Sequence, residues 1–179
     1  MSKKTLALIA ALTIVCALLV YAALVGQKKS TPPPSPTPTP TPSAAKTVLM
    51  LSQATASPTT VDVLIDANGN NVTAVQLELR YNPQAVAITA VRPGNFFTSS
   101  ITFITTIDNK TGRVTYALGI PPNGNAAVGK GTVAHVMYAR VGTPGQTTTL
   151  SLLPRSLVTA LGEKESVLKS ASPTTITLQ

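Results

Sequence analysis

Residues 74–81 read AVQLELRY, and apolar and polar side chains alternate along this stretch. Successive side chains of a β-strand point to opposite faces of the sheet. The Val and Leu side chains would therefore share one face, while Gln76, Glu78 and Arg80 would share the other. This pattern predicts a strand with one face in a hydrophobic core and a polar face toward solvent.

The same period of two recurs throughout the chain after Lys46, with abundant β-branched residues and no helical periodicity. Turn-forming clusters such as NGNN at 68–71 and DNKTG at 108–112 separate the runs. Nine such runs predict an all-β fold, either a sandwich or a barrel. The predicted strands are 47–51, 61–65, 74–81, 86–92, 101–108, 113–120, 132–141, 147–153 and 174–178.

The N-terminal part differs in composition from the rest. Residues 5–25 carry no charge, and a Pro/Thr-rich tract occupies most of residues 26–46. About 20 apolar residues cross a bilayer as a helix, so we expect residues 5–25 to be a transmembrane anchor. A cleaved signal peptide, whose apolar region is usually about 7–15 residues, is the alternative. Because proline excludes helix and sheet, residues 26–46 are predicted to be an extended linker.

This order of segments predicts a single-pass protein of the cell membrane. We expect residues 1–4 in the cytoplasm, since Lys3, Lys4 and the N-terminal amine precede the predicted anchor. Residues 47–179 would then form one domain outside the cell, held away from the membrane by the linker.

Charge and cysteine content exclude some classes of protein. The formal net charge of the 179-residue chain is +8, but four of its fourteen basic residues flank the predicted anchor. The remaining ten are scattered among six acidic residues, whereas nucleic-acid-binding proteins gather basic residues on one face. We therefore expect no nucleic-acid binding. Cys16 is the only cysteine and lies in the predicted anchor, so the predicted sandwich has no disulfide.

Several motifs follow one another in an informative order. The run at 61–65 is followed by VQLELRYNP at 75–83, GNFF at 94–97 and GKGTVAHVMY at 129–138. In this order, residues 47–179 resemble the cohesin module of cellulosome scaffold proteins, whose sandwich is related to that of cellulose-binding modules. The resemblance implies a nine-stranded β-sandwich of the jelly-roll or immunoglobulin-like type. It also implies a non-catalytic module that binds a dockerin carried by another protein, commonly a polysaccharide-degrading enzyme.

The resemblance also indicates where a partner would bind. In cohesins the dockerin helix docks on the strand before the Tyr-Asp-Pro motif, where outward Asn and Asp side chains are usual. The matching strand here presents Gln76 and Glu78, which hydrogen-bond but differ in identity. In the last motif, alternation places His135 and Met137 on the side opposite Tyr138. We predict Gln76, Glu78, His135 and Met137 as partner contacts; a solvated surface histidine is the alternative for His135.

The residues predict neither catalysis nor a bound metal ion. A Ser-His-Asp hydrolase needs a nucleophile beside its histidine, and the chain has no Gly-x-Ser-x-Gly turn. Glu163 and Glu165 stand in a Gly-Glu-Lys-Glu-Ser segment typical of a solvated loop. Residues 66–70 imitate the start of a calcium loop, but Leu77 occupies the position that requires a bidentate Glu. We therefore expect no enzyme activity, no cofactor and no metal, and a tight strand connection at 66–70.

Two other functions stay open. A carbohydrate-binding module attaching the cell to a polysaccharide would have the same sandwich and would stack exposed aromatic rings on sugars. Phe96 and Phe97 are adjacent, so an extended backbone would send one of them outward, with Tyr116 as a further candidate. A structural or adhesion domain of the cell envelope is the third interpretation.

Overall fold

The computed structural model describes residues 13, 14, 16–19, 21, 45–55 and 57–179. The described residues before residue 45 are helical. Most of the predicted anchor, residues 5–25, lies outside the described residues, as do residues 1–4 and the Pro/Thr-rich tract up to residue 44. Within the described part of the chain, no helix has the length and apolar character needed to cross a membrane.

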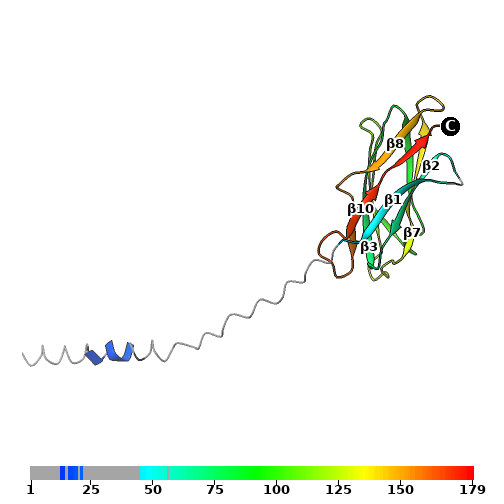
Figure 1. Cartoon of the computed structure of the whole chain (residues 1–179). Coiled ribbons are helices and arrows are strands. Elements are labelled where there is room, and N and C mark those ends of the chain that lie inside the picture. Colours follow the sequence, from blue (N-terminus) through cyan, green and yellow to red (C-terminus); the bar gives the residue numbers. More distant parts are fainter. Residues whose placement is uncertain (1–12, 15, 20, 22–44, 56) are drawn as a thin grey trace, which may run out of the picture. The chain divides into compact units, whose positions relative to one another are not determined.

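From residue 45 onward the chain forms a β-sandwich of two sheets (Figure 1). The five-stranded sheet has the order β10-β1-β2-β7-β4, and the six-stranded sheet has the order β11-β8-β3-β6-β5, with β9 also paired to β3. Strand β1 runs parallel to β10, and the other pairs are antiparallel. The strands are β1 (Thr47–Gln53), β2 (Thr60–Asp66), β3 (Val72–Arg80), β4 (Val86–Pro93), β5 (Ile101–Asp108), β6 (Arg113–Gly119), β7 (Lys130–Arg140), β8 (Thr147–Leu152), β9 (Leu157–Ala160), β10 (Leu168–Ser172) and β11 (Thr174–Thr177).

The predicted all-β sandwich is confirmed, but the predicted number of nine strands is wrong. The described residues contain eleven strands, and the two additional ones are β9 and β10. Strand β9 is only four residues long, and β10 shows no alternation of buried and exposed side chains. Main-chain pairing with β3 and β1 holds these strands in place. Val158 and Ala160 of β9 are buried in alternation, but a run of four residues is too short to stand out in the sequence.

The core lies between the two sheets and follows the predicted alternation. Leu77 and Leu79 of β3 are at most 1% exposed, and across the sandwich Leu49 and Val63 are completely buried. Tyr116 of β6 is the largest of the fully buried side chains. Burying one such Leu or Val side chain contributes about 1.5–3 kcal/mol, so the sheets are held together without a disulfide.

The expectation that Phe96 or Phe97 points outward is wrong. Their side chains are only 7% and 5% exposed, and their rings meet edge to face with centroids 5.0 Å apart. The Phe96 N–H donates to the Thr132 carbonyl, which holds this loop against the sandwich. The backbone there is not an extended strand, so adjacent side chains do not alternate between core and solvent.

The Asn109 side chain holds the turn between β5 and β6 by hydrogen bonds to Tyr81 and Ile88. The Asn109 Oδ1 accepts hydrogen bonds from the Tyr81 hydroxyl (2.6 Å) and the Ile88 N–H (2.8 Å), while its Nδ2 donates to the Ile88 carbonyl (3.0 Å). Gly112 in the same turn has a φ of +68°, and the Cβ of any other residue there would lie 2.2 Å from the Tyr81 carbonyl oxygen. These contacts fix the ends of β3 and β6 relative to each other.

Candidate partner-binding face

The four predicted contact residues do not share a face. Gln76 and Glu78 lie on β3 of the six-stranded sheet, whereas His135 and Met137 lie on β7 of the five-stranded sheet. The buried neighbours of each pair point into the common core, so the two pairs face solvent on opposite sides of the sandwich. A single docked helix contacts one pair or the other.

His135 is neither free nor part of a metal site among the described residues. Its Nδ1 lies 2.7 Å from Asp62 Oδ1 on the neighbouring strand β2, and its side chain is 42% exposed. Arg92 of β4 stands opposite His135 on the other side, so an acid, a histidine and a base form one row across three strands. The predicted outward orientation of His135 is confirmed, and its role in partner binding stays a prediction.

The outer surface of the six-stranded sheet is the more distinctive candidate, and we call it the six-strand face. It combines large apolar side chains at one end with charged side chains at the other. Its residues are Ala74, Gln76, Glu78 and Arg80 of β3; Arg113, Thr115, Ala117 and Gly119 of β6; Ile101, Phe103, Ile104 and Thr106 of β5; and Leu157 and Thr159 of β9.

A shallow apolar depression occupies one end of this face. Phe103 (57% exposed), Leu157 (43%) and Ile104 (42%) border it, and its volume is about 260 Å³. The small residues Ala74 and Ala117 also line it. Next to them, a Cβ on Gly119 would lie 2.8 Å from the Ala74 Cβ and 3.0 Å from the Phe103 ring. Small residues beside large exposed ones create a recess of the size of an apolar side chain.

A β-bulge explains why two large apolar residues project side by side. The pairing of β5 with β6 shifts between Thr102 and Ile104, which leaves Phe103 as the extra residue. Strict alternation would send Phe103 and Ile104 to opposite faces, but the bulge places both over β6. The sequence did not reveal this site. Its trace in the sequence is an interrupted alternation of polar and apolar residues at 101–105, and an irregular strand without a bulge would show the same interruption.

The other end of the face is polar. Thr115 donates to Glu78 Oε2 at 3.1 Å, and the Glu78 main chain is tied to the loop beyond β8 by the Leu153 N–H at 2.7 Å. One strand position further on, Arg80 and Arg113 stand directly opposite each other, and both are exposed. The six-strand face is therefore amphipathic along the direction of β3.

Comparison with known proteins identifies the architecture. No family model matches the chain, and neither does any curated protein. Among solved structures, a non-cellulosomal cohesin from the archaeon Archaeoglobus fulgidus has a TM-score of 0.57 at 17% identity, covering 75% of this chain and 92% of its own. A type II cohesin domain from the cellulosome of Acetivibrio cellulolyticus has a TM-score of 0.56 at 17% identity, covering 75% and 95%. The sandwich has the cohesin fold.

A third similar structure includes a bound partner. The third ScaC cohesin of Acetivibrio cellulolyticus, solved in complex with the ScaB dockerin, has a TM-score of 0.59 at 11% identity, covering 74% of this chain and 99% of its own. The cohesin resemblance predicted from the motif order is thus confirmed for the fold.

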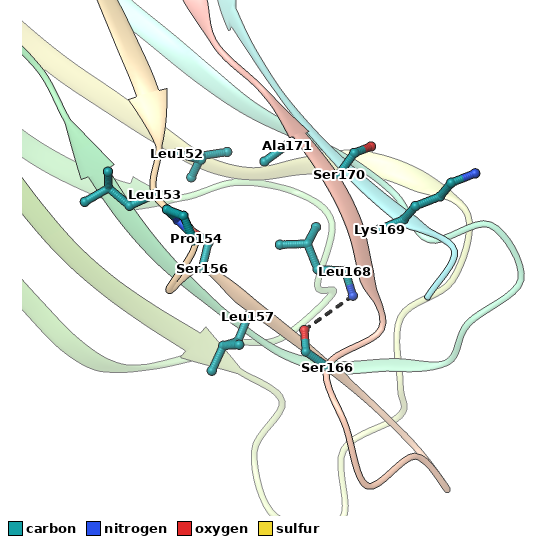
Figure 2. A pocket seen from close by; sticks show the side chains of 10 residues that line it. All are labelled: Leu152, Leu153, Pro154, Ser156, Leu157, Ser166, Leu168, Lys169, Ser170 and Ala171. Carbon is teal, nitrogen blue, oxygen red and sulfur yellow. Dashed lines mark hydrogen bonds between the residues drawn. The ribbon is translucent and has the colours of Figure 1, made fainter. Parts of the chain in front are cut away.

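The cohesin-fold domain has a second depression, beside β10, which Figure 2 shows from close by. Leu152, Leu157 and Leu168 line it, and Lys169 points away from it. The Ser166 Oγ accepts hydrogen bonds from the Leu168 N–H (3.3 Å) and the Val158 N–H (3.1 Å), so this hydroxyl is engaged in holding the main chain. The depression lies where the edge strand β10 departs from the loop between β8 and β9.

In the cohesin-fold domain, Asp66 stabilises the connection that follows β2. Asp66 binds Lys130 Nζ at 3.0 Å and the Asn68 N–H at 3.1 Å, and these hydrogen bonds, with the Lys130 charge, hold the pKa of its carboxyl below the ordinary value. Asn68 (φ +47°) and Gly69 (φ +86°) form the tight connection between β2 and β3 that the sequence predicts. Among the described residues, no group of three His, Cys, Asp or Glu side chains is placed to hold a metal ion.

Proposed function

We propose that this chain is a non-catalytic binding module and that its partner is a dockerin-type module of another protein. The cohesin fold supports this proposal, and the ScaC cohesin with the same fold was solved with a dockerin. The observation that carries it is the apolar depression on the six-strand face, bordered by Phe103, Ile104 and Leu157. An exposed apolar patch with a polar surround is typical of a protein–protein interaction site.

The partner would lie along β3 on the six-strand face. This strand is central in its sheet, with β6 on one side and β8 and β9 on the other, so its position is rigid. A preformed, rigid surface loses little conformational entropy when a partner binds. Gln76 and Glu78 belong to this face, so two of the four predicted contacts fit the proposal, whereas His135 and Met137 lie on the opposite sheet.

The alternative function, binding to polysaccharide, was suggested by aromatic residues that were expected to be exposed. Phe96, Phe97 and Tyr116 are all buried, so none of them offers a ring face for stacking on sugar. Phe103 is the exposed aromatic residue of the six-strand face, and it stands at the edge of a depression and not on a flat platform.

We also propose that the domain is displayed outside the cell on a membrane anchor. The uncharged stretch 5–25 and the Pro/Thr-rich tract in residues 26–46 support this arrangement. A domain that recruits a secreted enzyme has to stand clear of the membrane, and a polyproline II linker of this composition provides a semi-rigid spacer.

The test is retention of purified dockerin domains, of both type I and type II, on the immobilised full-length chain in detergent. We expect retention at micromolar concentration, and we expect Phe103→Ala combined with Leu157→Ala to weaken it about 30-fold or more, since central apolar anchors dominate interface energies. Met137→Ala is the matched control: it truncates an apolar side chain on the opposite face and should leave retention unchanged.

Two results would contradict the proposal. One is the absence of retention for every dockerin domain in the panel. The other is retention that falls with Met137→Ala and not with the Phe103/Leu157 pair, because the partner would then occupy the five-stranded sheet.

A further inference from the structure

Arg80 and Arg113 form an unusual pair at the polar end of the six-strand face. They occupy directly opposite positions on the antiparallel strands β3 and β6, and both side chains are exposed. The ion pairs among the described residues are Lys130–Asp66 and His135–Asp62, so neither guanidinium has a carboxylate partner.

The two nearest carboxylates are engaged elsewhere. Glu78 accepts a hydrogen bond from the Thr115 hydroxyl at 3.1 Å. Asp108, whose main chain pairs with Arg113, turns its carboxylate into its own loop, where it accepts from the Lys110 N–H (2.9 Å), the Thr111 N–H (3.2 Å) and the Thr111 hydroxyl (2.6 Å). Neither guanidinium therefore forms an ion pair within the described part of the chain.

Like charges directly opposite each other on neighbouring strands destabilise a sheet. Such a local conflict without a compensating contact in the free protein is typical of a functional site. A carboxylate placed between two guanidinium groups would accept charge-assisted hydrogen bonds from both and remove the repulsion. The pair thus has the chemistry of an anion receptor, on the same face as the apolar depression.

We propose that Arg80 and Arg113 bind a carboxylate of the docked partner, and that this carboxylate is on the same helix as the apolar side chain seated in the depression. This inference rests on the proposed function, because it specifies the partner's chemistry on the six-strand face. It predicts a partner helix with one large apolar residue and one Asp or Glu on the same side.

The geometry of the sheet sets the spacing between these two partner residues. From Gln76, which lines the depression, to Arg80 is four strand positions, or about 13 Å at the rise of a β-strand. Residues about seven apart on a helix lie on the same side and roughly 10.5 Å apart along its axis. The reach of a Glu and an Arg side chain covers the difference, so the carboxylate should follow or precede the apolar anchor by about seven residues.

The first test measures the repulsion in the full-length chain alone. Because Arg113→Gln removes one of two opposed charges, we expect it to raise the urea midpoint of the sandwich. Arg155→Gln, at an exposed arginine outside this face, is the control and should leave the midpoint unchanged. An unchanged or lower midpoint for Arg113→Gln would show that the pair carries no stored repulsion and would overturn the inference.

The second test uses three lactam-bridged helical peptides of about 16 residues as probes. One carries Leu and Glu seven positions apart, the second has Gln for the Glu, and the third has the Glu moved by two positions, which turns it to the other side of the helix. We expect the first to bind the full-length chain about tenfold tighter than the other two. This difference should vanish in the Arg80→Gln/Arg113→Gln variant. Equal binding of the three peptides, or none at millimolar concentration, would overturn the inference.

The two proposals fail in distinguishable ways. If the Arg80→Gln/Arg113→Gln variant retains dockerin as well as the natural chain does, the two arginines do not bind a partner carboxylate, and the dockerin proposal is unaffected. If no dockerin is retained while the first peptide binds selectively, the dockerin proposal fails. The inference that the partner is a helix with a carboxylate beside its apolar anchor is then supported.

Discussion

Asn109 shows how one residue can hold several segments together. Its amide bonds both polar groups of Ile88 and the hydroxyl of Tyr81, so it joins β4 to the end of β3. Asn109→Ala leaves three hydrogen-bonding groups without this partner, and we expect it to lower the free energy of unfolding by about 1–3 kcal/mol. Urea denaturation measures this loss. Asn125→Ala, in an exposed loop, is the control; equal effects of the two changes would contradict the account.

We expect two carboxylates at strand ends to contribute to stability in acid. Hydrogen bonds lower the pKa of Asp108, first from the Thr111 hydroxyl and then from the Thr111 and Lys110 N–H groups, and the Lys130 contact lowers that of Asp66. Because both pKa values are lower in the folded state than the ordinary value of 3.8, the stabilising effect of the two carboxylates is present above pH 3.8 and is lost as pH falls through the folded values.

We therefore expect the urea midpoint to decline as the pH is lowered from 5 to about 2, and to decline less in the Asp66→Asn/Asp108→Asn variant. Glu163→Gln, at a loop carboxylate, serves as the control. A variant whose midpoint keeps the full pH dependence of the natural chain would refute the assignment.

At the scale of elements, the β5–β6 hairpin depends on its turn glycine. Gly112 and Gly129 both have positive φ (+68° and +80°), but a Cβ on Gly112 would lie 2.2 Å from the Tyr81 carbonyl oxygen, whereas a Cβ on Gly129 meets nothing within 4 Å. Both Gly→Ala changes incur the strain of positive φ, about 1 kcal/mol. We expect Gly112→Ala to lose about 1–3 kcal/mol more because of the clash. Unfolding free energies of the two variants compare directly, and equal losses would argue against the contact.

Alternation of polar and apolar residues predicts some strands of this sandwich and misses others. The alternation of 74–81 predicts β3 because half of its side chains must be buried. The short β9 buries Val158 and Ala160 but spans only four residues, and the edge strand β10 has no buried residue, so neither leaves a comparable pattern. The bulge at Phe103 acts in the same way, because it changes which face a side chain occupies without changing the composition of the strand.

At the scale of the whole molecule, display outside the cell is a prediction that cysteine labelling can check. Cys16 is the only natural cysteine and lies in the predicted anchor, and Ser170 is exposed on β10. In intact cells, a membrane-impermeant maleimide should label the Ser170→Cys variant and not the natural chain. Labelling of Ser170→Cys only after cell lysis would place the domain on the cytoplasmic side.

The amino-acid sequence was sufficient to predict the fold class, the alternating core of β3 and the cohesin resemblance, because these depend on which side chains must be buried along each strand and in what order the strands follow. Which surface residues lie together became visible in the three-dimensional arrangement. It separated Gln76 and Glu78 from His135 and Met137, because strands three and seven belong to different sheets. It also brought Phe103 beside Leu157, and Arg80 opposite Arg113. Burial is a property of each residue and leaves a local pattern, whereas adjacency between strands arises from long-range pairing that no local pattern records.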